Sequence, residues 1–188
     1  PTYMGLIKQI DDQMGVLMAF LEARGLLDTT MIVFTSDHGD YLGDHWMGEK
    51  DLFHDASAKI PLIVIDPSAD ADSTRGTVCD ALVEAIDLAP TFIDYFGGKP
   101  PDHILEGRSL MPLLHGKQPM DWRKVVFSEY DYCMQDVRLK LNQPIEQCRL
   151  FMVFDGRWKY IHASGFRPML YDLHEDPQEL TDHGEDPS

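Results

Sequence analysis

Two continuous apolar runs, separated by a polar stretch, constrain the fold of this chain more than any other feature of its sequence. They are "MIVFTS" at residues 31–36 and "IPLIVIDP" at residues 60–67. Their apolar residues are consecutive rather than alternating, which is typical of strands covered on both faces of a parallel sheet. Before them, apolar residues recur with helical spacing over residues 3–25, which predicts a first helix. A second helix is expected in the latter part of 81–98. This part of the chain therefore predicts an α/β sheet with flanking helices.

The sequence changes character near Trp122. "KVVFSEY" and "PMLYDL" each predict a strand, and "LFMVFDGRWKYIHA" predicts two strands around a turn at Asp155-Gly156. A turn leading to a short helix is expected in "HEDPQEL". We therefore expect an α/β part over residues 1–120 and a small antiparallel β subdomain over residues 121–188.

The formal net charge of −16 argues against several classes of partner. Nucleic-acid backbones and anionic membranes need clustered Lys and Arg, so neither is expected as a partner. No apolar stretch reaches the roughly 20 residues of a membrane-spanning helix, and no signal-peptide pattern is present. Cys79, Cys133 and Cys148 have neither CxxC nor metal-site spacing, so we expect reduced thiols in a cytoplasmic protein.

The stretch between the two apolar runs, "TSDHGDYLGDHWMGEKDLFHD" at residues 35–55, concentrates metal-capable side chains. Asp37 and His38 follow the first strand, at the sheet edge where open α/β sheets bind ligands. Neighbouring side chains can share one ion only where a strand gives way to a loop, and Gly39 permits the backbone that this needs. A carboxylate and an imidazole suit Mn, Zn or Fe better than Ca. Two ligands do not complete a catalytic site, and a capping Asp beside a surface His is the alternative.

Other motifs in this loop fit less well. Asp37, Asp40 and Asp44 lack the EF-hand spacing, and neither HExxH nor G-x-S-x-G occurs in the chain. Lys50 lies twelve residues beyond His38, where a cation would neutralise charge on the oxygens of a tetrahedral oxyanion. A lone lysine in an acidic loop is more commonly a solvated partner of its neighbours, so the residues alone leave both interpretations open.

Six segments in a fixed order give the sequence a family resemblance. They are "VFTSDHGDYLGDH", "GEKDLFHDASAKIPLIV", "AIDLAPTFIDYFG", "LEGRSLMPLL", "DGRWKYIH" and "LYDLHEDPQEL". Together they resemble the C-terminal portion of the sulfatase branch of the alkaline phosphatase superfamily, over almost the whole chain. "SDHG" and "GEKDLFHD" look most like the phosphonate monoester hydrolases, which also cleave phosphodiesters. The resemblance implies the C-terminal part of a mixed, mostly parallel sheet for residues 1–120, and a small antiparallel sheet, truncated at its C-terminal end, for residues 121–188.

The resemblance also implies roles for residues of the loop. Asp37 and His38 match two ligands of a divalent metal ion, and Lys50 matches the lysine that contacts the substrate's sulfuryl or phosphoryl oxygens. His45 and His54 lie nearby and are candidates for substrate contact. The family's nucleophile is a formylglycine made from a Cys in a C-x-P-S-R or C-x-A-x-R segment, and no cysteine here lies in one. The nucleophile and the family's first metal-binding aspartate are therefore expected outside this chain.

The function expected from these features is that of a fragment of a metal-dependent hydrolase of phosphonate monoesters or phosphodiesters, inactive by itself. A sulfatase is the alternative, and a non-catalytic binding relic of the fold is a second one. The substrate is expected to be a small phosphonate, phosphate or sulfate ester, and the family implies a homo-oligomer. The chain starts without an initiator Met and stops at "HGEDPS", as if cut from a longer sequence. Removing half of a sheet would leave apolar strand faces bare.

Overall fold

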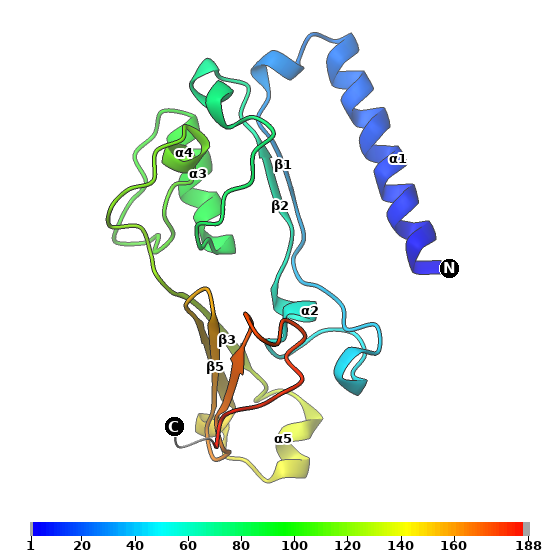
Figure 1. The fold of residues 1–188 in the computed structure, drawn as a ribbon, viewed down its shortest axis with the longest axis vertical. Helices are drawn as coiled ribbons and strands as arrows, with labels where there is room; N and C mark the ends of the chain where they lie inside the picture. The colour runs from blue at the N-terminus through cyan, green and yellow to red at the C-terminus, as the bar shows by residue number, and fades with distance from the viewer. Residues whose placement is uncertain (1, 186–188) are drawn as a thin grey trace.

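The computed structural model describes residues 2–185, which form an elongated molecule (Figure 1). Helix α1 lies along one side, a two-stranded sheet occupies the middle, and a four-stranded sheet lies at the other end. The helices are α1 (Thr2–Ala23), α2 (Asp55–Ala58), α3 (Leu88–Tyr95), α4 (Met111–Leu114) and α5 (Asp136–Leu141). The strands are β1 (Ile32–Thr35), β2 (Leu62–Ile65), β3 (Val126–Asp131), β4 (Arg149–Phe154), β5 (Trp158–Ala163) and β6 (Met169–Asp172).

The two-stranded sheet pairs β1 with β2 in antiparallel orientation, from Ile32 opposite Ile65 to Thr35 opposite Leu62. The expectation that these two strands run parallel was wrong. Continuous apolar residues indicate cover on both faces, which a strand can have in either direction, so the pattern held no information about direction. Both strands exist where they were predicted, and the mixed α/β class with flanking helices and a second, antiparallel sheet is confirmed.

The four-stranded sheet is an antiparallel meander in the order β3-β4-β5-β6. Its central turn is the predicted one, where Gly156 adopts a left-handed backbone with φ of 99°. Strand β5 alternates exposed and buried residues from Trp158 to Ala163, as a sheet with one covered face requires. The core beside this sheet contains Phe53, from the loop after β1, and a larger set from the sheet and its connections: Tyr132, Cys148, Leu150, Met152, Ile161, Ala163 and Tyr171. Helix α5 was not predicted, and the short helix expected in "HEDPQEL" is a turn. The boundary between residues 120 and 121 stays a prediction.

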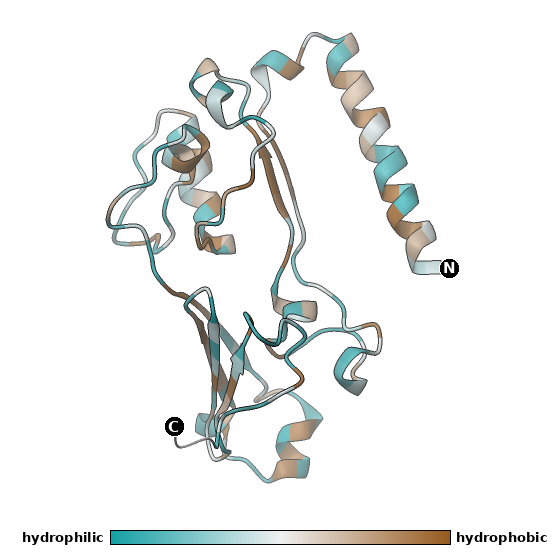
Figure 2. Cartoon of the chain, viewed as in Figure 1, coloured by the Kyte–Doolittle hydropathy of each residue, from teal (hydrophilic) through white to brown (hydrophobic). Residues whose placement is uncertain are grey.

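Apolar residues lie along α1 and on β2 (Figure 2), and many of their side chains are exposed. Helix α1 has no buried residue. Its exposed apolar side chains are Tyr3, Met4, Leu6, Ile7, Ile10, Val16, Leu17 and Phe20. On β2, Ile63 is 57% exposed and Ile65 is 38% exposed, so the structure has the bare apolar strand face that the sequence predicted. Over residues 2–185, no helix has both the length and the apolar character needed to cross a membrane.

Candidate active site

The candidate site begins two residues beyond β1, where the strand ends. The hydroxyl of Ser36 donates a hydrogen bond of 2.7 Å to the carbonyl of His38, and the N–H of His38 donates one of 3.0 Å to Asp37 Oδ1. These two bonds turn the chain so that the neighbouring side chains approach each other, with Asp37 Oδ2 3.5 Å from His38 Nε2. The same backbone N–H lowers the pKa of Asp37 below its usual value, so this carboxylate is charged at neutral pH.

The contacts of His38 determine the form of its imidazole. Nδ1 lies 2.7 Å from the carbonyl of Gly39, and Nε2 lies 2.9 Å from Lys50 Nζ. A carbonyl only accepts a hydrogen bond and an ammonium only donates one, so Nδ1 carries the proton and Nε2 offers its lone pair. That lone pair faces the same side as the Asp37 carboxylate and the Lys50 ammonium. The structure therefore brings together Asp37, His38 and Lys50, as the sequence predicted.

Gly39 holds this turn against helix α2. Its N–H donates a hydrogen bond of 2.8 Å to the carbonyl of Ser57. A Cβ added at Gly39 would lie 2.0 Å from the carbonyl oxygen of Ala56, which no side chain can tolerate. The sequence predicted a conformational role for Gly39, but close approach to α2 is the reason for a glycine at this position.

The backbone between the metal-capable pair and Phe53, on both sides of Lys50, is strained. Six residues other than glycine have positive φ there, namely Leu42, His45, Trp46, Glu49, Asp51 and Leu52. Left-handed backbone is uncommon for such residues, and runs of it persist only where surrounding contacts impose it. Glu49 and Asp51 flank Lys50 directly, so the position of the lysine depends on contacts that hold this loop in shape.

His45 and His54 lie together in an aromatic cluster with Tyr41 and Tyr171. Their rings stack with centroids 3.9 Å apart, and His54 Nδ1 lies 2.9 Å from the hydroxyl of Tyr41. Tyr171 meets His54 edge to face at 5.6 Å. Burial lowers the pKa of His54 to about 4, so its ring is neutral near pH 7. The proposed substrate contacts of both histidines stay predictions.

Sequence reasoning missed Lys159, which is only 2% exposed on β5. Its Nζ lies 2.9 Å from the carbonyl of Phe53, 2.5 Å from Asp55 Oδ1 and 2.7 Å from Glu179 Oε1. The alternation of β5 could have revealed it, because Lys159 shares the inward face with Ile161 and Ala163. A lysine at such a position must have charged partners.

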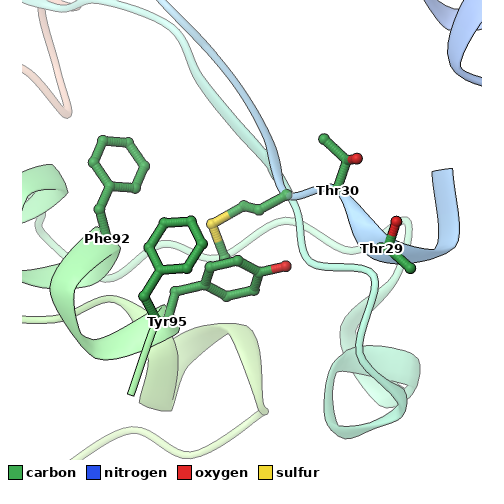
Figure 3. A pocket seen from close by; sticks show the side chains of 6 residues that line it. Thr29, Thr30, Phe92 and Tyr95 are labelled. Atoms are coloured by element: carbon green, nitrogen blue, oxygen red, sulfur yellow. The ribbon is translucent and has the colours of Figure 1, made fainter. Parts of the chain in front are cut away.

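Asp37, His38 and Lys50 lie on the wall of a large open groove. Strand β2 and much of the segment 74–86 also line this groove, so the three side chains share it with many apolar residues. A separate small pocket lies at the opposite end of β1, between Thr29–Met31 and the aromatic side chains of α3 (Figure 3). The hydroxyl of Tyr95 points towards Thr29 and Thr30 there, and none of the three residues of the candidate site lines this pocket.

The donor set fits part of a metal site. Two ligand atoms bound at about 2.1 Å to one tetrahedral ion are roughly 3.4 Å apart, close to the 3.5 Å between Asp37 Oδ2 and His38 Nε2. Among residues 2–185, no group of three His, Cys, Asp or Glu side chains is gathered for a metal. Asp37 and His38 can therefore supply two donors, and the remaining ligands of an ion would come from elsewhere.

The chain is similar to known proteins over its whole length. Residues 43–188 match the family "N-sulphoglucosamine sulphohydrolase, C-terminal". The multifunctional alkaline phosphatase superfamily protein PehA of Trinickia caryophylli is 36% identical, in an alignment covering 100% of this chain and 36% of that protein. For the N-acetylglucosamine-6-O-sulfatase of Bacteroides thetaiotaomicron the identity is 32%, covering 95% of this chain and 30% of the sulfatase. The chain thus spans about a third of the length of the curated relatives it matches.

A solved structure shares the fold. The phosphonate monoester hydrolase of Agrobacterium radiobacter superposes with a TM-score of 0.88 at 36% sequence identity, covering 96% of this chain and 36% of that chain. Similarity of this degree extends through both sheets, since it includes nearly every described element.

Proposed function

Because this chain belongs to the sulfatase family of the alkaline phosphatase superfamily and matches its C-terminal portion, we propose that it forms one wall of the active site of a metal-dependent hydrolase. The family expected from the six sequence segments is thereby confirmed. The proposed substrates are phosphonate monoesters and phosphodiesters, which the likeness to a phosphonate monoester hydrolase supports. The observation that carries the proposal is the convergence of Asp37, His38 and Lys50 at the end of β1.

Asp37 and His38 are the proposed ligands of one divalent ion, with Mn, Zn or Fe favoured over Ca by the mixed oxygen and nitrogen donors. When bound, such an ion supplies positive charge to a substrate oxygen and to the nucleophile. His38 presents the correct nitrogen, because its Nδ1–H is held by the carbonyl of Gly39. The lowered pKa of Asp37 keeps the second donor ionised.

Lys50 is the proposed contact to the oxygens on which charge develops in the transition state. Its ammonium contacts His38 Nε2, the atom that would bind the ion. One lone pair cannot serve both, so with an ion bound at His38 the Lys50 ammonium would lose its contact with the imidazole. It would then be available to the oxygens of a substrate.

The nucleophile is proposed to come from the part of the relatives that this chain does not span. No cysteine of this chain lies in a formylglycine-type segment, so its residues do not fit that group. The bare apolar surfaces of α1 and β2 support this arrangement, because a further part of the hydrolase domain would cover them. The three cysteines are unpaired, which supports the proposed cytoplasmic location. Association of copies into a homo-oligomer is a proposal from the family resemblance alone.

A sulfatase is the second candidate function. The similarity to an N-acetylglucosamine-6-O-sulfatase and the family of the sulphohydrolase C-terminal region both favour it. The two candidates share Asp37, His38 and Lys50, so these residues do not distinguish the ester that is cleaved.

The proposed function is tested with the native gene product that carries this chain, supplied with Mn²⁺ or Zn²⁺. We expect an aryl phosphonate ester to be hydrolysed with higher kcat/KM than the matched aryl sulfate, and Asp37→Asn to abolish turnover of both. Asp44→Asn, an exposed carboxylate in the same loop, is the matched control. Equal activity of the two variants would refute the proposed site. The 188-residue chain assayed alone should be inactive, and turnover that Lys50→Ala removes would show that it carries its own nucleophile.

A further inference from the structure

We propose that Lys159, in the antiparallel sheet, is a positioning residue for the candidate active site. It acts through helix α2, which supports both the turn with Asp37 and His38 and the segment that follows Lys50. The structural part of this inference stands on contacts alone, whereas its catalytic consequence rests on the proposed function.

Lys159 is the centre of a buried ionic cluster that joins three distant segments. Its ammonium donates hydrogen bonds to the carbonyl of Phe53 and to Asp55 Oδ1, which is 104 residues away in the sequence. Glu179 Oε1 completes the cluster at 2.7 Å as an ion pair, without the alignment of a hydrogen bond. A buried ammonium is stable only with such partners, so the three segments are tied to one point.

Glu179 connects the cluster to the first residue of α2. Its Oε2 accepts a hydrogen bond of 2.6 Å from the N–H of Asp55, the first residue of the helix. Glu179 is 3% exposed and has a left-handed backbone with φ of 56°. A carboxylate that is buried on a strained backbone shows that the surrounding contacts impose its position.

Helix α2, held in place by this cluster, supports the candidate site on two sides. On one side, the N–H of Gly39 bonds to the carbonyl of Ser57, and the absence of a Cβ lets the turn lie directly on the helix. On the other side, only Asp51 and Leu52, both with positive φ, separate Lys50 from the anchored Phe53. Movement of α2 would therefore displace both halves of the site.

A neighbouring ion pair provides a matched control. Arg157, the residue before β5, pairs with Asp172 of β6, with Nη2 2.6 Å from Oδ2. The Arg157 side chain is 52% exposed, and its described polar contacts lie within the antiparallel sheet and its turns. Replacing Arg157 therefore weakens a contact within the sheet, whereas replacing Lys159 weakens the contact between the sheet and the segment that follows Lys50.

The first test is hydrogen exchange of the 188-residue chain, comparing Lys159→Met with Arg157→Met. We expect Lys159→Met to speed exchange of the Gly39 and Tyr41 amides by about tenfold or more, while amides of β4 and β5 change less than about threefold. The proposal would be overturned if amide exchange accelerated equally throughout the sheet, or if exchange in the loop did not change. Lys159 would then only stabilise the fold. If Lys159→Met does not fold, Glu179→Gln gives the same comparison while retaining the ammonium and its bonds to Phe53 and Asp55.

The second test is the kinetics of the native gene product with an aryl phosphonate ester. Small displacements of catalytic groups cost about a hundredfold in rate, so Lys159→Met should lower kcat by roughly that factor and change KM less than about threefold. Arg157→Met should leave both within about twofold. If the proposed function is wrong, even the unsubstituted protein will show no turnover, and the exchange experiment still decides the positioning role. Equal kinetic effects of the two substitutions would contradict it.

Discussion

The loop from Asp37 to Leu52 and the β3–β6 sheet lie side by side but are built in opposite ways. The sheet has regular antiparallel pairing and a continuous core, and its charged groups are mostly paired. The loop has an exposed Asp37, an exposed Lys50 and six non-glycine residues with positive φ. A strained, polar segment is stable here because a rigid element holds its end. The comparison indicates that the sheet supplies rigidity, while the loop carries the residues of the proposed site.

The largest effect is expected from a core residue of the sheet. Ile161 is 1% exposed at the centre of the β4–β5 pairing. Truncation by Ile161→Ala leaves a cavity and should lower the free energy of unfolding by about 3–4 kcal/mol. Ile63→Ala, at a residue 57% exposed on β2, should cost less than about 1 kcal/mol in the same 188-residue chain. Urea denaturation followed by circular dichroism measures both. Similar losses would mean that the sheet is not the more stable region.

Lys50→Ala in the native gene product should strongly lower activity while leaving stability almost unchanged. Removal of one preorganised cation from an oxyanion site lowers kcat by roughly 10²–10³-fold, or about 3–4 kcal/mol of transition-state stabilisation. Because Lys50 is exposed, the free energy of unfolding should change by no more than about 0.5 kcal/mol. Lys140→Ala on α5 is the control, and steady-state kinetics with thermal melts separate the two effects. A large loss of stability with Lys50→Ala would show that the loop contributes to the fold.

His54, where the loop meets the sheet, makes stability depend on pH. Its pKa falls from 6.5 to about 4 on folding, so the unfolded chain binds the proton more readily. Stability should therefore be complete above pH 6.5 and fall as the pH drops from 6.5 towards 4, by roughly 2 kcal/mol after allowance for solvent screening. His54→Gln should flatten this part of the curve, whereas the exposed His174→Gln should not. A curve for His54→Gln that still falls over this interval would assign the dependence to other groups.

The proximity of Asp37, His38 and Lys50 could be predicted from the sequence, whereas the contacts that support them could not. Asp37, His38 and Lys50 lie within one loop after an apolar strand, so local pattern and family resemblance located them. The cluster of Lys159 with Asp55 and Glu179 joins residues up to 124 apart, and local patterns carry no information on such pairing. The direction of β2 relative to β1 was missed for a similar reason, because apolar content reports burial and not orientation. The strained loop backbone was also unpredicted, since residues such as Leu42, Trp46 and Leu52 rarely adopt positive φ.

The smallest predicted effect concerns the competition between Lys50 and a metal ion for His38. The ammonium lies 2.9 Å from Nε2, so it must be displaced and also repels the incoming cation. Removing one nearby charge in a water-exposed site changes binding by about 1 kcal/mol. Lys50→Met should therefore raise the affinity of the 188-residue chain for Mn²⁺ roughly fivefold, and Lys140→Met should leave it unchanged. Titration followed by Mn²⁺ electron paramagnetic resonance measures this affinity. Weaker binding by Lys50→Met would instead mean that the lysine holds the imidazole in its metal-ready orientation, and the loop would then depend on its own contacts as well as on the sheet.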